Sequence, residues 1–213
     1  MNTRVGQPGL ASEERYARDS SYPTPEGIIH VSIVCGKNYA ESLKFYQTVL
    51  NMRIVYEIQG RVRFTALSFD EENHRVGLIE RPQLQTRPPD TVRIEHSSWR
   101  YRSLGEALET VRHVEKELGI FPNAVHQGPI ISISYQDPDK NRCELIVDCA
   151  PTQADIITFY HETLAENPDF DTLMPFDLRG MLEKEAAGEP LEHLLSYTWV
   201  RDNLPPLTSK RYL

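Results

Sequence analysis

The chain has 213 residues, a formal net charge of −8 and 39% hydrophobic residues. An acidic chain without a Lys/Arg stripe cannot neutralise a row of phosphates, which argues against nucleic acid as a partner. No apolar run is long enough to span a bilayer, so the sequence predicts a globular protein without a membrane partner. The cysteines are odd in number and lie in or beside predicted strands, which indicates reduced thiols and a cytoplasmic protein. They are Cys35, Cys143 and Cys149.

Residues 1–25 are polar and contain Gly, Pro and Ser, so we expect a flexible N-terminal arm there and no signal peptide. Residues 26–150 then repeat one pattern twice, in modules 26–82 and 91–150. In each module a helical period of 3.6 follows one β-branched run and precedes three more. This internal duplication predicts an α+β fold of paired βαβββ modules. The expected elements are strand 28–34, helix 38–50 and strands 53–58, 63–69 and 75–79, then strand 92–99, helix 103–118 and strands 123–126, 130–135 and 142–147.

Residues 151–213 form a tail that does not share the repeat. Helices are expected at 154–165, 176–187 and 191–197, separated by residues with Pro and Gly. A packing extension is favoured over a catalytic lid. Apolar side chains around Ile157, Tyr160 and Leu164 need burial against the sheet or a second subunit, so we expect a homodimer or larger homo-oligomer.

Aligning the two copies selects four positions. His30 lies early in the first strand of the first copy, and His96 lies in the first strand of the second. Gly77 and Glu144 lie in the last strands, 77 − 30 = 47 and 144 − 96 = 48 residues later. If the modules pack side by side, these positions converge in one cleft. Three of them can bind a metal and Gly77 cannot.

Two imidazoles and one carboxylate leave open positions on a metal ion. This ligand set is typical of non-haem Fe(II) that holds a substrate and O₂ together, although Mn(II), Zn(II) and Ni(II) accept the same donors. A strand histidine on its own is more often a surface or satisfied group, and Glu144 on its own could form an edge-strand salt bridge. The shared register of the two copies argues for the metal site instead.

Two stretches, Phe45 to Met52 and Asp137 to Leu145, resemble the vicinal oxygen chelate superfamily. Within it, Asp70 to Val76 and His126 to Pro129 are similar to type I extradiol, catechol ring-cleaving dioxygenases with a single pair of modules. The resemblance covers about residues 26–150 and continues more weakly into the tail. The superfamily also contains glyoxalases, isomerases, epimerases and drug-binding proteins, so the fold alone does not define the reaction.

The resemblance implies that His30, His96 and Glu144 are iron ligands, that His74 is an acid/base catalyst, and that His126 contacts a substrate hydroxyl. An imidazole that titrates near neutrality and lies close to Gly77 suits proton transfer to and from a catechol. His126 precedes a Gly-Pro bend that could aim its side chain across the metal. The alternatives are a solvated charge cluster for His74 and a surface loop histidine for His126.

One departure concerns the substrate side. Ser134 stands where the family usually has a tyrosine beside the substrate, and Tyr135 is expected to face away by strand alternation. Lys140 replaces a usual turn glycine without touching the metal. The smaller Ser134 side chain leaves room for a bulkier aromatic substrate.

Two reactions remain open. In the first, an aromatic vicinal diol and O₂ bind together and the ring opens beside the diol, as in the extradiol dioxygenases. In the second, a non-oxidative lyase or isomerase uses a divalent metal with His74 or His126 as base. Gly77 favours the first, because glyoxalase-type sites usually carry a fourth protein ligand there. A metal-free binding module is a third class, which the triad argues against.

Overall fold

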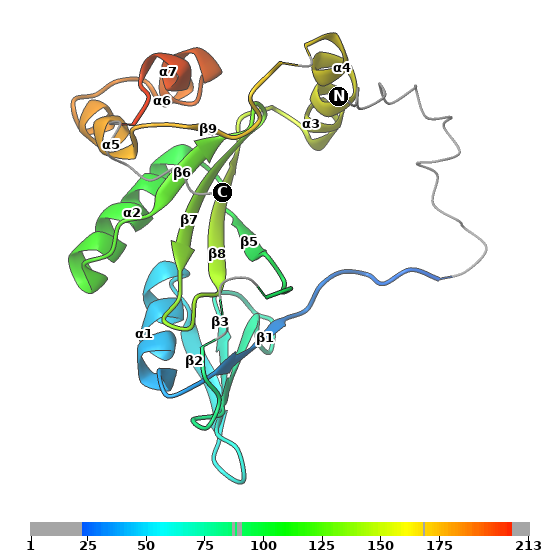
Figure 1. Cartoon of the computed structure of the whole chain (residues 1–213), viewed down its shortest axis with the longest axis vertical. Coiled ribbons are helices and arrows are strands. Elements are labelled where there is room, and N and C mark those ends of the chain that lie inside the picture. The colour runs from blue at the N-terminus through cyan, green and yellow to red at the C-terminus, as the bar shows by residue number, and fades with distance from the viewer. Residues whose placement is uncertain (1–22, 87, 89–90, 168, 206–213) are drawn as a thin grey trace, which may run out of the picture.

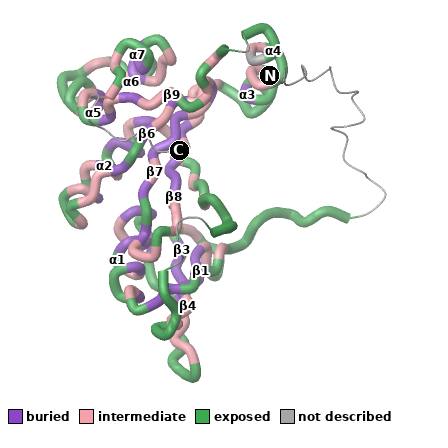
Figure 2. The backbone as a smooth tube through the Cα atoms, in the orientation of Figure 1, coloured by how far each residue is buried: buried purple, intermediate pink, exposed green. Residues whose placement is uncertain are grey.

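The computed structural model describes residues 23–86, 88, 91–167 and 169–205. Most of the predicted N-terminal arm therefore lies outside the described residues, as do residues 206–213 of the tail. Residues 23–30 are exposed and run away from the body of the molecule (Figures 1 and 2). No helix within the described ranges is long and apolar enough to cross a membrane.

The first module is a four-stranded mixed sheet in the order β1-β4-β3-β2, called sheet A here. Its elements are β1 (Val31–Cys35), α1 (Tyr39–Val49), β2 (Arg53–Ile58), β3 (Phe64–Ser68) and β4 (Val76–Glu80). β1 begins three residues later than expected. The Arg75 guanidinium donates to the backbone carbonyls of Ile28 and Ile29. These carbonyls therefore bond to a side chain and not to a neighbouring strand.

The second module is a five-stranded sheet in the order β5-β8-β7-β6-β9, called sheet B here. Its elements are β5 (His96–Arg100), α2 (Leu104–Leu118), β6 (Asn123–His126), β7 (Ile130–Gln136), β8 (Arg142–Asp148) and β9 (Met174–Pro175). The α2 limits agree with the prediction, because Ser103 caps its first turn and Gly119 ends it in the left-handed conformation. β9 comes from the tail and was not predicted. A strand of two residues is too short to show the alternating hydrophobic pattern from which strands are predicted.

The rest of the tail is helical and packs as an extension of sheet B. Its elements are α3 (Gln153–Thr158), a π-helical segment (Phe159–Thr163), α4 (Leu164–Glu166), α5 (Leu178–Ala186), α6 (Leu191–Leu194) and α7 (Tyr197–Asp202). Met181, Leu194 and Val200 join the hydrophobic core. The Arg179 guanidinium, which bonds to Glu115, connects α5 to α2.

The strand registers confirm the paired modules and the α+β fold. Ser32 lies opposite Gly77 in the parallel β1–β4 pair, and Ser98 lies opposite Glu144 in the parallel β5–β8 pair. His30 and His96 each stand two residues before these serines. The two histidines are therefore equivalent positions of a duplicated unit.

The two modules are joined through the sides that carry their helices. Figure 1 shows sheet A and sheet B one above the other with α1 and α2 on the same side, and these helices are in contact. The turn between β7 and β8 reaches α1, where the Tyr46 hydroxyl donates to Asp137 at 3.0 Å. Asp139 accepts from the Gly36 N–H and from the Asn38 amide, both at 3.1 Å. These contacts, named the β7–β8 turn contacts below, tie the strand that carries Glu144 to the first module.

Candidate metal site

Glu144 lies on the open face of sheet B, the face away from α2. It is 3% exposed. Ser132 donates to one of its carboxylate oxygens and Ser98 to the other. A buried carboxylate needs such donors, because its charge is costly away from water. The serines thus hold Glu144 in place while leaving further lone pairs for another partner.

His96 completes a pair with Glu144. Its Nε2 lies 3.3 Å from Glu144 Oε2, and its Nδ1 contacts the Glu95 carboxylate. Glu95 in turn accepts from Arg142 at 2.6 Å. A carboxylate on one imidazole nitrogen orients the ring so that the other nitrogen can face a metal, an arrangement typical of metal-ligating histidines.

Ser134 and Arg142 lie beside this pair. Ser134 is opposite Glu144 in the β7–β8 register, and Arg142 Nε donates to its hydroxyl at 3.2 Å. A second guanidinium nitrogen is 3.9 Å from Glu144 Oε1. The hydroxyl of Tyr135 lies buried on the other side, as strand alternation predicts, without a hydrogen-bond partner among the described residues.

The other two histidines form a pair on sheet A. The rings of His30 and His74 are 4.2 Å apart. The rings of Phe64 and Tyr56 meet His74 edge-on, at 5.8 and 6.1 Å. His74 lies two residues before β4, close to Gly77 along the chain. Partial burial, together with the neighbouring His30, lowers the pKa of His74.

Gly77 has a packing reason to be glycine. A Cβ at this position would stand 2.8 Å from the Phe64 ring and 3.2 Å from Ser32 Oγ. The aromatic ring therefore occupies the place where a side chain equivalent to Glu144 would project. Sequence reasoning missed Phe64 and Tyr56, whose only signal was their position as aromatic residues in predicted strands.

His126 lies on the opposite face of sheet B from Glu144. In the β6–β7 register it is opposite Ile131, whereas Ser132, which bonds Glu144, is opposite Val125. The His126 ring is fully buried; its Nδ1 accepts from the Gly128 N–H at 3.0 Å and its Nε2 lies 2.9 Å from the Leu195 carbonyl. Burial lowers its pKa.

The structure thus brings the predicted residues together in two pairs. We call His30 with His74 the first half-site and His96 with Glu144 the second half-site. Across residues 23–86, 88, 91–167 and 169–205, no three His, Cys, Asp or Glu side chains gather as a metal-binding group. The donors fit a transition metal by type, and the two pairs stand on different modules.

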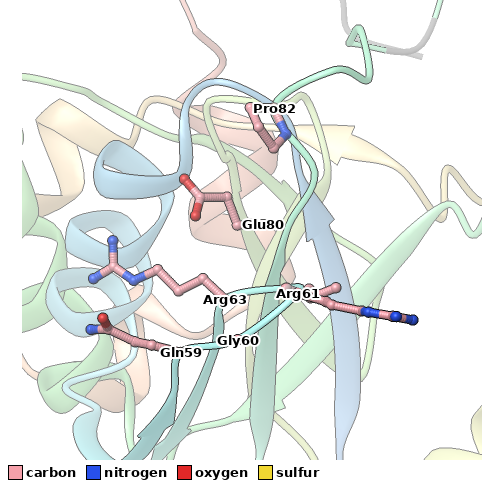
Figure 3. A pocket seen from close by; sticks show the side chains of 7 residues that line it. Gln59, Gly60, Arg61, Arg63, Glu80 and Pro82 are labelled. Carbon is pink, nitrogen blue, oxygen red and sulfur yellow. The ribbon is translucent and has the colours of Figure 1, made fainter.

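A hollow in the described part of the chain lies away from these residues. A cavity of about 460 Å³ sits at the β2–β3 loop and the far end of β4 from His74. Figure 3 shows Arg61 and Arg63 extending to opposite sides of this loop, with Glu80 nearby. The Arg63 guanidinium stacks on Tyr39 and pairs with Glu57. None of the predicted site residues lines this cavity.

Comparison with known proteins identifies the class. Residues 27–145 match the model of the Glyoxalase/Bleomycin resistance protein/Dioxygenase superfamily, which is more than half of the chain. The chain belongs to this superfamily, as the sequence motifs predicted. A solved glyoxylase/bleomycin resistance protein/dioxygenase domain from Frankia sp. EAN1pec shares the fold, with a TM-score of 0.52 and 16% identity over 62% of this chain and 99% of that one.

Two curated relatives are more specific. The chain is 30% identical over 166 residues to biphenyl-2,3-diol 1,2-dioxygenase 2 of Rhodococcus globerulus, covering 76% of this chain and 84% of the relative. It is 31% identical over 160 residues to biphenyl-2,3-diol 1,2-dioxygenase 3 of the same organism, covering 73% and 80%. The predicted resemblance to dioxygenases of aromatic diols is confirmed.

Proposed function

We propose that the protein is a metal-dependent dioxygenase that cleaves an aromatic vicinal diol next to its two hydroxyl groups. The observation that carries the proposal is the second half-site, where a buried carboxylate and an oriented imidazole nitrogen meet at 3.3 Å. Both relatives are named for oxygenation of an aromatic 2,3-diol, and they match over most of both chains.

The donor set supports Fe(II), with Mn(II), Zn(II) or Ni(II) as less favoured occupants. His30, His96 and Glu144 would hold the ion and leave positions open for two diol oxygens and O₂. Bound iron would supply the electronic path between diol and oxygen. Gly77 adds no fourth ligand, and the Phe64 ring fills its surroundings. This supports dioxygen chemistry over the lyase or isomerase alternative.

His74 is the acid/base group in this proposal. Its ring contacts the ligand candidate His30 and two aromatic rings, and Asn73 Oδ1 contacts its Nδ1. One ring nitrogen therefore remains to take a proton from a diol hydroxyl and return it. Partial burial and the neighbouring His30 lower the pKa of His74, which favours the neutral, proton-accepting form of the imidazole.

The substrate would lie between polar and aromatic surfaces. Ser134 is half-buried beside Glu144 and presents a small hydroxyl, with Arg142 behind it. Phe64 and Tyr56 offer flat rings around His74. A small polar residue at 134 supports a bulky aromatic diol as substrate.

We assign His126 a supporting role instead of the substrate contact expected from the resemblance. Both of its ring nitrogens have partners, and its ring lies on the face of sheet B away from Glu144. His126 connects β6 to the C-terminal extension through Leu195. The unpaired cysteines agree with a reducing compartment such as the cytoplasm. They are Cys35, Cys143 and Cys149.

The test is an oxygen-dependent assay. Protein loaded anaerobically with Fe(II) is mixed with catechol or biphenyl-2,3-diol, with and without air. We expect one O₂ consumed per diol and a yellow ring-opened product that forms only in air. Conversion without oxygen would transfer the assignment to the lyase or isomerase class, and binding without conversion would indicate a binding protein.

A further inference from the structure

His30, a candidate metal ligand, lies just outside the strand that follows it. β1 begins at Val31, and residues 23–30 are exposed and run away from the body of the molecule (Figure 1). The side chains of Ile28 and Ile29 are 83% and 55% exposed, so apolar packing does not hold this segment. Ordering a free backbone is costly, and a ligand has to be held close to its productive position. Another part of the molecule therefore has to fix His30.

The side chain of Arg75 makes this connection. Its Nη1 donates to the backbone carbonyls of Ile28 and Ile29, both at 3.2 Å. This nitrogen carries two hydrogens, so both bonds can form at once. Arg75 also binds the start of β1 with its backbone, because its carbonyl accepts from the Val31 N–H at 3.0 Å. One residue thus contacts the chain on both sides of His30.

Arg75 is itself held in place. The Asp70 carboxylate accepts from Nε at 3.0 Å and from Nη2 at 2.9 Å, so one carboxylate binds two nitrogens of the planar guanidinium. Ser68 donates to the same carboxylate at 2.9 Å. The backbone N–H of Arg75 donates to the Leu67 carbonyl at 2.7 Å. We call Asp70 and Arg75 the clamp.

The clamp and the acid/base candidate lie on one loop. Residues 69–75 connect β3 to β4 and carry Asp70, His74 and Arg75. The His74 ring is 4.2 Å from the His30 ring. The loop therefore contacts the His30 side chain through His74 and the backbone around His30 through Arg75, and so arranges both members of the first half-site.

We propose that Arg75 is a positioning residue of the metal site, which holds His30 through the backbone on either side of it. The inference rests on the proposed function, because it takes His30 as a metal ligand. It adds that a side chain of the β3–β4 loop sets the position of this ligand. Removing a residue that orients a metal ligand typically weakens metal affinity by about 10- to 100-fold.

Arg75→Gln tests the clamp, with Fe(II) affinity measured by anaerobic titration. The matched control is Arg63→Gln, because Arg63 is also a sheet A arginine, paired with Glu57 at 3.2 Å. We expect Fe(II) binding to weaken by about 10- to 100-fold in Arg75→Gln and to stay close to wild type in the control. Loss of a nearby positive charge would by itself strengthen cation binding, so the expected effect has the opposite sign from direct electrostatics. The same loss is expected in a His74→Phe background, because the clamp acts on His30 and not through His74.

A metal-free measurement makes the test independent of iron. Backbone NMR relaxation gives an order parameter for the His30 amide, about 0.85 for a rigid backbone and below about 0.6 for a flexible one. We expect a rigid value in wild type and Arg63→Gln and a flexible value in Arg75→Gln, while Leu78 within β4 stays rigid in all three. Arg75→Lys keeps the charge but lacks the planar fork, so it should lie between wild type and Arg75→Gln in both measurements.

Wild-type iron affinity in Arg75→Gln, or a His30 amide equally ordered in both proteins, would overturn the positioning role and leave the proposed function standing. An equal loss of affinity in Arg63→Gln would do the same, because it would indicate a general effect on sheet A. Wild-type protein that binds no Fe(II) although its His30 amide is rigid would overturn the proposed function, and with it the role of the clamp in metal binding.

Discussion

The two modules have the same strand register and opposite chemistry on their open faces. Phe64 and Ser132 occupy equivalent positions, each opposite an isoleucine of the last strand. Ala66 and Ser134 are the next pair, opposite Gly77 and Glu144. One module has an aromatic ring, a methyl group and a glycine where the other has two hydroxyls and a carboxylate.

The difference between the modules extends beyond the carboxylate itself, because the residues around it also differ. The carboxylate of Glu144 can be buried because the hydroxyls of Ser132 and Ser98 donate hydrogen bonds to it. Where the carboxylate is missing, the Phe64 ring takes its volume and packs against His74. The duplicated scaffold therefore carries a carboxylate with its hydroxyl donors on the open face of one module and an aromatic ring on the open face of the other.

The division predicts its largest effect at His74. In His74→Phe we expect Fe(II) and diol binding to persist while turnover falls by about 10² to 10⁴, the range typical of general acid-base groups. Glu144→Gln should instead lose the metal. Steady-state kinetics and anaerobic iron titration of both variants separate the two outcomes. Unchanged turnover in His74→Phe would contradict the assignment of proton transfer to the first module.

Gly77→Ala tests whether the aromatic ring excludes a side chain. A Cβ at position 77 would press on the Phe64 ring at 2.8 Å, so we expect the free energy of unfolding to fall by about 2 kcal/mol. In a Phe64→Ala background the same change should cost little, because the opposing ring is gone. Urea denaturation of the four proteins in this double-mutant cycle measures the coupling. Additive effects of Gly77→Ala and Phe64→Ala would show that the Phe64 ring moves aside at no cost in stability.

Tyr46→Phe tests the contacts that hold the two modules together. The Tyr46 hydroxyl is fully buried and donates to Asp137, a carboxyl group whose burial raises its pKa. Its removal should lower the free energy of unfolding by about 1 kcal/mol. Tyr135→Phe is the matched control, because that buried hydroxyl has no hydrogen-bond partner within the described part of the chain. Equal losses in both variants would mean that the Tyr46–Asp137 bond contributes nothing specific.

The smallest expected effect is a pH dependence of the free energy of unfolding, caused by His126 in the second module. Burial lowers the pKa of His126 in the folded state, so the unfolded chain takes up the proton first. Stability is therefore complete above the ordinary histidine value of 6.5 and is lost as the pH falls from there toward the folded pKa. The slope can reach at most about 1.4 kcal/mol per pH unit.

His126→Gln should flatten this acid limb in urea denaturation between pH 7 and 5. His193→Gln, at an exposed histidine, serves as the control and should keep the wild-type slope. An unchanged slope in His126→Gln would show that His126 is not the titrating group. A change in substrate KM with no change in the slope would return His126 to the substrate contact expected from the resemblance.

The duplication, the element order and the equivalence of His30 and His96 could be predicted from the sequence alone. Hydrophobic period and residue spacing are local signals, and a strand register one residue out of phase would put the wrong side chains in the core. The same locality explains why β9, a strand of two residues that pairs with a distant strand, was missed.

Other features depend on contacts between distant segments. His126 looked like a site residue in a Gly-Pro bend, yet the β6–β7 register turns it to the buried side, where the Leu195 carbonyl lies far along the chain. The serines that hold Glu144 come from two different strands. The sequence by itself determined the fold and which donors are available, since both follow from short-range patterns. Only the tertiary structure decided how the donors group, because the contacts between α1, α2 and the β7–β8 turn fix the modules so that His30 and Glu144 stand in separate half-sites.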